Sequence, residues 1–334
     1  MLYVSTREKY DAFTAHRTLT EDRTPDGGLY LPYRMPGFST DEIRALKGKS
    51  FGQCTAEILN QFFAARLNAW DVEFCVGRYP VKIAAMSHRI LIAETWRNLD
   101  GSYEKMERRL AAKICGCDET EVKLTSWLRI AIRIAVLFGV FSELMRSDAY
   151  DSSQRIDVAV NAGDFSLPMA LWYGREMGLP IAAIICCCGE SSGVWDLLHL
   201  GEFRGGVAAA ELERLVYGTL GISEAKRFGQ ICEKSGEFRL LPAAAETLRV
   251  GMFAAVVSRE RMSSVIPSVY RTNSYVLEPN AAYGYGGLMD YRAKTGESKT
   301  ALLLADTNPA EQANTVAAAM KITAEELNRL LEKA

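Results

Sequence analysis

Two cysteines separated by one glycine are the most reactive local pattern in this chain of 334 residues. Cys115-Gly-Cys117 has a spacing that suits a redox pair, and thiolates are also ligands for zinc. No second pair matches it in the sequence, and the three histidines are scattered at positions 16, 88 and 199. We therefore expect free thiols and no metal site.

A glycine-rich segment, Gly284-Tyr-Gly-Gly287, is the other short pattern that invites a chemical interpretation. The sequence has no Gly-x-x-x-x-Gly-Lys-Ser/Thr phosphate loop and no Gly-x-Gly-x-x-Gly after a strand. We expect these glycines to allow close helix packing rather than to form a ligand loop.

Charge and hydropathy exclude two classes of partner. The chain carries 39 basic and 41 acidic residues, mixed along its length, and its formal net charge is −2. This balance gives no field that would attract nucleic acid or an anionic membrane. No apolar run approaches the roughly 20 residues that span a bilayer, and the first residues lack a signal-peptide pattern. We expect a cytoplasmic protein.

Strand and helix patterns alternate along the chain. Apolar residues at helical spacing predict helices at 8–20, 40–70, 102–114, 126–145, 168–177, 309–320 and 324–333. Apolar runs predict strands at 87–93, 156–160, 181–187 and 302–305. Ser39-Thr-Asp-Glu42 has the pattern of a helix start.

This alternation predicts an α/β fold with a mostly parallel sheet covered on both faces. Ligands in such folds bind beyond the carboxyl ends of the strands. The loops expected at those ends span residues 161–166, 189–193 and 306–309, and all three are polar and turn-prone. We therefore expect the functional site at these loops.

Several segments resemble the threonine synthase family of fold-type II pyridoxal-phosphate enzymes. Tyr3-Val-Ser-Thr-Arg7 and Pro25-Asp-Gly-Gly-Leu-Tyr-Leu-Pro32 look like the family's amino-terminal signature. Further matches follow in the same order at 177–181, 197–203, 211–216, 277–284 and 304–310. The resemblance implies the three-layer fold of the tryptophan synthase β type over nearly the whole chain.

The same resemblance implies that the chain has three parts and that it lacks most of one lobe. The parts are a threonine-synthase-type amino-terminal region at 1–85, a remnant of the small lobe at 86–125 and a large α/β domain at 126–334. Family members should carry most of a mobile lobe between Lys113 and Trp127, where this chain has only a short segment. We expect this small cofactor lobe, with the loop that grips the substrate's acidic end, to be largely missing.

The family's Schiff-base lysine aligns with Glu104, inside Gly101-Ser-Tyr-Glu-Lys-Met106. A carboxylate cannot condense with an aldehyde. The adjacent Lys105 would take the position if the alignment moved by one residue, but the Gly-Ser-aromatic match would be lost. On a helix the side chain would also turn by about 100°. We favour the alignment that places Glu104 there and Lys105 on a solvated face.

The family's phosphate loop resembles the segment that begins at Gly163 and continues through Asp164, Phe165 and Ser166. Asp164 would repel a phosphate, and Ser166 replaces a residue that must let the backbone approach closely. Asp306 stands where the family has a small hydroxyl residue near the pyridine nitrogen. These five residues are therefore interpreted as a degenerate cofactor site. Asparagines also replace family histidines at positions 280 and 308.

The resemblance therefore predicts a threonine-synthase-like protein without catalysis and without a cofactor. Its role would be ligand binding or regulation, with an amino-acid-like small molecule or a partner enzyme. The alternative is an active pyridoxal-phosphate-dependent threonine synthase, or a related carbon-oxygen lyase acting on a phosphorylated amino acid, that uses Lys105. A third hypothesis is a decaying gene product with no selected activity.

Overall fold

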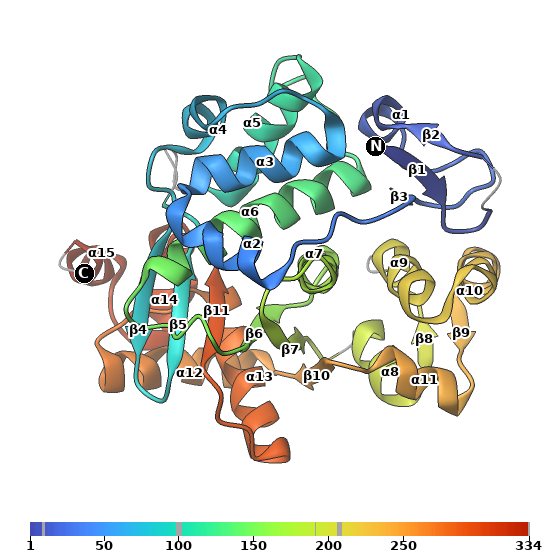
Figure 1. The fold of residues 1–334 in the computed structure, drawn as a ribbon. Helices are drawn as coiled ribbons and strands as arrows, with labels where there is room; N and C mark the ends of the chain where they lie inside the picture. The colour runs from blue at the N-terminus through green and yellow to red at the C-terminus, as the bar shows by residue number, and fades with distance from the viewer. Residues whose placement is uncertain (9–10, 98–101, 191, 206–208, 333–334) are drawn as a thin grey trace.

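A six-stranded sheet forms the centre of the molecule (Figure 1). The computed structural model describes residues 1–8, 11–97, 102–190, 192–205 and 209–332. Its strand order is β10-β7-β6-β11-β5-β4, in which five strands run parallel and β4 is antiparallel to β5. The expected α/β fold with a mostly parallel sheet is confirmed. None of the helices described is long and apolar enough to cross a membrane.

The strands are short, and they belong to three sheets. The central sheet contains β4 (Lys82–Met86), β5 (Ile90–Glu94), β6 (Ile156–Asn161), β7 (Ile181–Cys188), β10 (Met252–Val256) and β11 (Ala301–Ala305). An antiparallel sheet near the amino terminus contains β1 (Leu2–Ser5), β2 (Phe13–Thr14) and β3 (Tyr30–Pro32). A two-stranded sheet contains β8 (Glu202–Arg204) and β9 (Glu237–Arg239).

Helices account for most of the remaining described chain. Before β6 these are α1 (Ala15–Thr20), α2 (Thr40–Ala45), η1 (Leu46–Gly48), α3 (Phe51–Phe63), α4 (Ala69–Val76), α5 (Tyr103–Cys115) and α6 (Ser126–Arg146). After β6 they are α7 (Ser166–Glu176), α8 (Gly193–Leu200), α9 (Ala209–Leu220), α10 (Ile222–Ser235), α11 (Pro242–Leu248), α12 (Arg259–Asn273), α13 (Pro279–Thr295), η2 (Pro309–Gln312), α14 (Ala313–Met320) and α15 (Ala324–Leu331).

Both faces of the central sheet are buried, which explains the continuous apolar strands. Successive residues of a strand point to opposite faces. On β7, Cys186 and Cys188 join the core on the side of α6, whereas Cys187 joins the core on the side of α13. Figure 1 shows α6 and α7 on one side of the sheet and α12 and α13 on the other. All three of these thiols are buried, as a parallel strand between two helical layers requires.

The glycines of α13 permit close packing, as predicted. A Cβ atom at Gly287 would lie 2.3 Å from the Cys187 sulfur, and one at Gly284 would lie 3.2 Å from the carbonyl oxygen of Ala159. The helix can therefore lie directly against β6 and β7.

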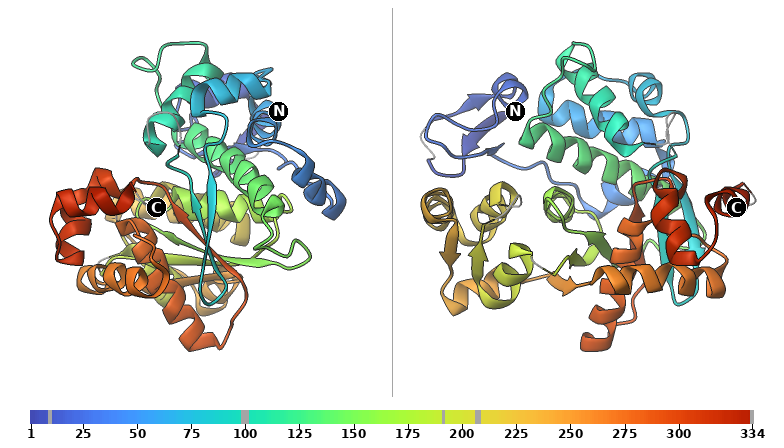
Figure 2. Two further views of the ribbon diagram at one scale, coloured as in Figure 1. Left: turned by 90° about the vertical axis from the view of Figure 1, so that its left-hand side faces the viewer. Right: turned by 180° about the vertical axis from the view of Figure 1, so that it is seen from behind.

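The amino-terminal signature forms a junction between distant parts of the chain. Ser5 donates hydrogen bonds to Asp26 at 2.8–2.9 Å, which joins the two signature motifs. The guanidinium of Arg7 contacts Glu213 on α9 at 2.9 Å and Glu233 on α10 at 2.6 Å. The side chains of Arg7 and Glu213 are each 3% exposed. The right-hand view in Figure 2 places this region over α9 and α10.

Two expected helices differ from the observed elements. Within 8–20, Phe13–Thr14 pairs with β1 as a strand, so only Ala15–Thr20 is helical, and residues 9–10 lie outside the described part. The expected helix at 40–70 is divided into α2, η1 and α3, followed by the loop before α4. Ser39 and Ser50 each cap a helix in a capping box, because each interrupts the apolar pattern with a side-chain acceptor.

Two other expected elements shift or divide. Residues 87–89 form a turn that joins β4 to β5, so the strand expected at 87–93 runs at 90–94 instead. The helix expected at 309–320 begins as the 3-10 turn η2 and continues as α14.

The segment between β5 and α6 is where a lobe is expected to be missing. Its described residues contain the single helix α5 and an isolated bridge between Ser102 and Thr307. The helix packs against α4 and α6. The predicted loss of the lobe, and the three predicted parts of the chain, stay predictions.

Trp127 provides a test of the core. Its ring is 1% exposed and packs edge-on against Tyr3, Phe62 and Tyr173 at centroid distances of 5.6–5.9 Å. We expect Trp127→Ala to lower the free energy of unfolding by about 3–5 kcal/mol, measured by urea denaturation. Trp70→Ala is the matched control, because that ring is 80% exposed and should change stability by less than about 0.5 kcal/mol.

Arg7 provides a test of the junction that it forms with Glu213 and Glu233. Arg7→Met keeps most of the aliphatic stem but leaves the buried Glu213 carboxylate unpaired, so we expect a loss of about 3–5 kcal/mol in the free energy of unfolding. Arg44→Met removes an exposed pair with Asp41 and should have little effect. Equal effects of the two substitutions would show that the junction does not stabilise the fold.

Candidate functional site

Two of the three expected loops, those after β6 and β11, meet at the carboxyl ends of the central strands, beside the end of β5. Thr95 follows β5, and its backbone N–H and hydroxyl both donate to the carbonyl oxygen of Ala305 at the end of β11. Asn161 ends β6, and its amide donates to Asn280 on α13 at 2.8 Å. Asn280 in turn donates to Asp306 at 3.0 Å. The loops after β6 and β11 are thus joined by a chain of side-chain hydrogen bonds.

A partly buried ion cluster lies beside these loops. Arg133, which α6 directs toward the loop after β6, contacts Glu107 of α5 through its Nε atom at 2.6 Å. Its Nη1 atom donates to the hydroxyl of Ser166 and lies 3.6 Å from the Asp164 carboxylate. Arg129, one turn earlier on α6, also lies 3.6 Å from Asp164.

Burial and charge oppose each other in this cluster. Burial raises the pKa of Glu107 above its usual range, although the nearby Arg133 works to lower it. Burial would lower the pKa of Arg133, but the charge of Glu107 reverses this effect and raises it. Burial would also raise the pKa of Asp164, yet Arg133 and the hydrogen bonds from Ser166 hold that pKa below its ordinary value. Asp164 is therefore a carboxylate at neutral pH.

The carboxylate of Asp164 accepts a hydrogen bond from the backbone of its own loop. One of its oxygens accepts from the backbone N–H of Ser166 at 3.0 Å and from the hydroxyl of the same residue at 2.5 Å. The N–H of Gly163 donates to the Asn161 side chain at 3.1 Å, and the N–H of Phe165 donates to the Ala162 carbonyl at 3.2 Å. These three N–H groups at the start of α7 already have acceptors within the chain.

Little space remains between the cluster and the sheet. A cavity of about 20 Å³ is lined by Tyr103 and Arg133 on one side and by Thr95 and Asp306 on the other, and aliphatic side chains of α6 close it. This volume accommodates roughly one water molecule. An amino acid or an aromatic cofactor does not fit it in this conformation.

The two candidate residues on α5 point away from the cavity. The Glu104 side chain is 74% exposed and lies 3.5 Å from Arg108 on the same helix. Lys105 is also exposed. Tyr103 and Glu107 instead occupy the inward face of α5, because they are one turn apart.

Sequence reasoning missed Glu107, Arg129 and Arg133. A signal for the arginines was present, because both interrupt the apolar stripe of α6 four residues apart and therefore share one helix face. Glu107 lies similarly among the buried Met106 and Leu110 of α5. That these charges meet is a consequence of the packing of α5 against α6, which one sequence does not reveal.

The loop after β7 has a spacing that the sequence analysis overlooked. Gly189-Glu-Ser-Ser-Gly193 matches the Gly-x-Ser-x-Gly pattern between a strand and a helix. Its central residue, Ser191, lies outside the described residues. His199 stacks on Trp195 near the far end of α8. No contact in the described part of the chain activates a serine here.

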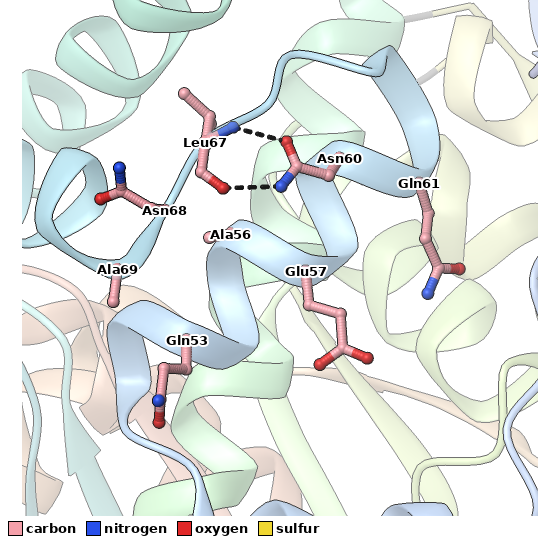
Figure 3. Close-up of a pocket in the computed structure, with 8 residues that line it drawn as sticks. All are labelled: Gln53, Ala56, Glu57, Asn60, Gln61, Leu67, Asn68 and Ala69. Carbon is pink, nitrogen blue, oxygen red and sulfur yellow. Dashed lines mark hydrogen bonds between the residues drawn. The ribbon is translucent and has the colours of Figure 1, made fainter.

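A larger hollow lies on the surface between α3 and the loop before α4 (Figure 3). Its volume is about 520 Å³, and its most prominent polar group is Asn60. Figure 3 shows the Asn60 side chain bonded to the backbone N–H and carbonyl of Leu67, both at 2.7 Å. The amide therefore closes a turn of the chain, and the hollow offers no catalytic group pair.

The amino-terminal region has a recognisable family pattern. Residues 2–78 match the family model described as "Threonine synthase N terminus". Threonine synthase from Methylobacillus glycogenes is 38% identical over 61 residues, which cover 18% of this chain and 13% of that protein. Human threonine synthase-like 1 is 22% identical over 175 residues, or 47% of this chain. The match covers only 23% of that relative's length.

Solved structures extend the likeness to the whole fold. PLP-bound threonine synthase from Brucella melitensis superposes with a TM-score of 0.84 at 18% identity, over 96% of this chain and 92% of the other. Yeast threonine synthase gives 0.82 at 14% identity, over 99% and 94%. This chain therefore has the fold of threonine synthases, and residues 2–78 carry that family's amino-terminal pattern. The structural matches, all below a fifth in identity, establish the shared fold alone.

The residues at this site do not fit pyridoxal phosphate, the cofactor bound in the Brucella melitensis structure. The position expected for the lysine is an exposed glutamate, and three N–H groups of the phosphate-type loop, those of Gly163, Phe165 and Ser166, already have acceptors. The charge of Asp164 and the small volume of the cavity both oppose a phosphorylated ring. We therefore derive no catalytic step through this cofactor. No group of three or more metal-ligating side chains occurs among the described residues.

Asp164 gives a pH-dependent test of the cluster. Its pKa is depressed in the folded chain, so its contribution to stability is present above its unfolded pKa, near 3.9, and is lost as pH falls through the folded value. We expect Asp164→Asn to cost about 1 kcal/mol at pH 7, and the difference from the unmodified protein should shrink below about pH 4. Urea denaturation at several pH values measures this, with Asp41→Asn as an exposed control. A difference independent of pH would contradict the assignment.

Proposed function

We propose that this chain is a threonine-synthase-like protein without pyridoxal-phosphate catalysis, which acts by binding. The observation that carries this proposal is the internal carboxylate of Asp164, which holds the N–H of Ser166 at the start of α7. A cofactor phosphate would have to displace this carboxylate and would then face it as a like charge.

The more buried of the two arginines does not relieve this conflict. Arg133 is paired with Glu107 and with the loop, and separating it would leave a buried carboxylate without its partner. An anionic ligand would therefore have to compete with two internal carboxylates. This supports a role that does not depend on an anion at the family's phosphate position.

The small cavity also limits which ligand the protein could bind. Because it has space for roughly one water, an amino-acid-like molecule does not fit there, and we therefore favour a partner enzyme as the ligand. We therefore propose that the protein acts by contacting a partner through its surface, and not by catalysing a reaction at the carboxyl ends of the strands.

Cofactor loading tests this proposal. The purified chain is incubated with pyridoxal phosphate, reduced with borohydride and mapped by peptide mass. We expect Lys105 to take up no more cofactor than Lys47, another exposed lysine. Glu104→Lys supplies an amine and allows capture of the aldehyde, but we expect no phosphate release from O-phosphohomoserine, because Asp164 and the filled cavity remain.

Two matched variants decide between the proposal and its alternative. Phosphate release by the unmodified chain that is abolished by Lys105→Ala and retained by Lys47→Ala would contradict the proposal. It would establish an active enzyme that uses Lys105.

A further inference from the structure

The Cys115-Gly-Cys117 pattern lies at the end of α5, on the side of the molecule where α5 packs against α4. Cys115 is the last residue of the helix and is half-buried, and Cys117 is exposed. Neither thiol belongs to the site described above.

The local backbone brings the two cysteines together. Gly116 adopts a left-handed conformation with φ of 68°, which ends the helix. The N–H groups of Gly116 and Cys117 both donate to the carbonyl oxygen of Ala112, at 2.8 and 3.2 Å. The bond from Cys117 is the 6→1 bond of a Schellman motif and the bond from Gly116 is the 5→1 bond of an αL cap, and together they fold Cys117 back over the last turn of α5. Burial, with a smaller contribution from the Cys117 thiol, raises the pKa of Cys115 to about 11.

Cys117 borders an open cavity of about 680 Å³ between α4 and α5. Cys117 and Gly116 line it, together with Cys75 of α4, which is buried. Lys113 and Arg109 lie at its edge and form ion pairs with Asp71 and Glu119. A small disulfide-containing molecule can therefore reach Cys117 from solvent, whereas Cys115 is half-buried.

We propose that Cys115 and Cys117 form a reversible thiol–disulfide exchange site that reacts with low-molecular-weight disulfides such as glutathione disulfide. The Cys117 thiolate attacks one sulfur of that disulfide, forms a mixed disulfide and releases one glutathione thiolate. Cys115 then loses its proton and attacks the Cys117 sulfur, which closes the protein disulfide and releases the second glutathione. The protein loses two electrons and two protons, and the glutathione disulfide is reduced to two thiols.

The order of attack follows from exposure and acidity. The exposed thiol meets the reagent first. Closure requires the thiolate of Cys115, whose raised pKa makes this the slower step at neutral pH. The fraction of mixed disulfide should therefore fall, and the fraction of closed disulfide should rise, as the reaction pH increases from 7 to 9.

Peptide mass mapping of the full chain tests this directly. Trypsin releases residues 114–123 as one peptide that contains Cys115 and Cys117 and no other cysteine. After incubation with glutathione disulfide, acid quench and alkylation, we expect this peptide to be lighter by two hydrogens and unalkylated. Excess reduced glutathione should restore the dialkylated form.

Three serine variants separate the roles. Cys115→Ser should accumulate the glutathione adduct on Cys117, and Cys117→Ser should remain largely unmodified over the same time. Cys232→Ser removes a half-buried thiol outside the motif and should behave like the unmodified chain. Circular dichroism checks that each variant is folded.

Three outcomes would overturn the proposal. At pH 9, where closure should be fast, the unmodified chain could still accumulate the Cys117 adduct as Cys115→Ser does, or it could remain a dithiol. Peptide 114–123 could also become linked to peptide 67–78, which would show that the exposed thiol pairs with Cys75 instead. None of these results depends on whether the protein binds pyridoxal phosphate.

Discussion

The guanidinium of Arg133 is the constraint on which the candidate site depends. It is buried between Glu107 of α5 and the loop that carries Asp164 and Ser166, so it holds α5, α6 and the start of α7 in one arrangement. A buried charge of this kind is tolerated only when its partners are in place. The same contacts fill the region where a ligand of this fold would bind, because Arg133 and Tyr103 line the small remaining cavity.

The fold has been retained where its residues stabilise structure. The amino-terminal motifs that mark the family form the junction of Arg7 with Glu213 and Glu233, so they preserve packing whether or not the chain is an enzyme. Residues that stabilise the fold are thus distinct from residues that would bind a cofactor. This explains how the chain can superpose on threonine synthases at 14–18% identity while the position expected for the lysine is an exposed glutamate. Likeness of fold therefore gives little information about activity here.

The sequence predicted the parts of the fold that depend on local pattern. Continuous apolar runs identified β6, β7 and β11, and the long stripe beginning at Trp127 identified α6. Phe13 was wrongly placed in a helix, because its pairing with Tyr3 is a contact between separate segments that periodicity does not encode. The cluster of Glu107 with Arg133 was missed for the same reason. Asp164 was identified from family resemblance, but its bond to the N–H of Ser166 required the structure.

Hydrogen exchange at the start of α7 tests the central claim, that this loop provides the acceptors for three of its own N–H groups. Amide exchange of Gly163, Phe165 and Ser166 is measured with and without saturating pyridoxal phosphate. Because their acceptors lie within the chain, we predict the same exchange rates in both conditions. Slower exchange at these three amides when the cofactor is present would show that its phosphate displaces Asp164, and it would contradict the account.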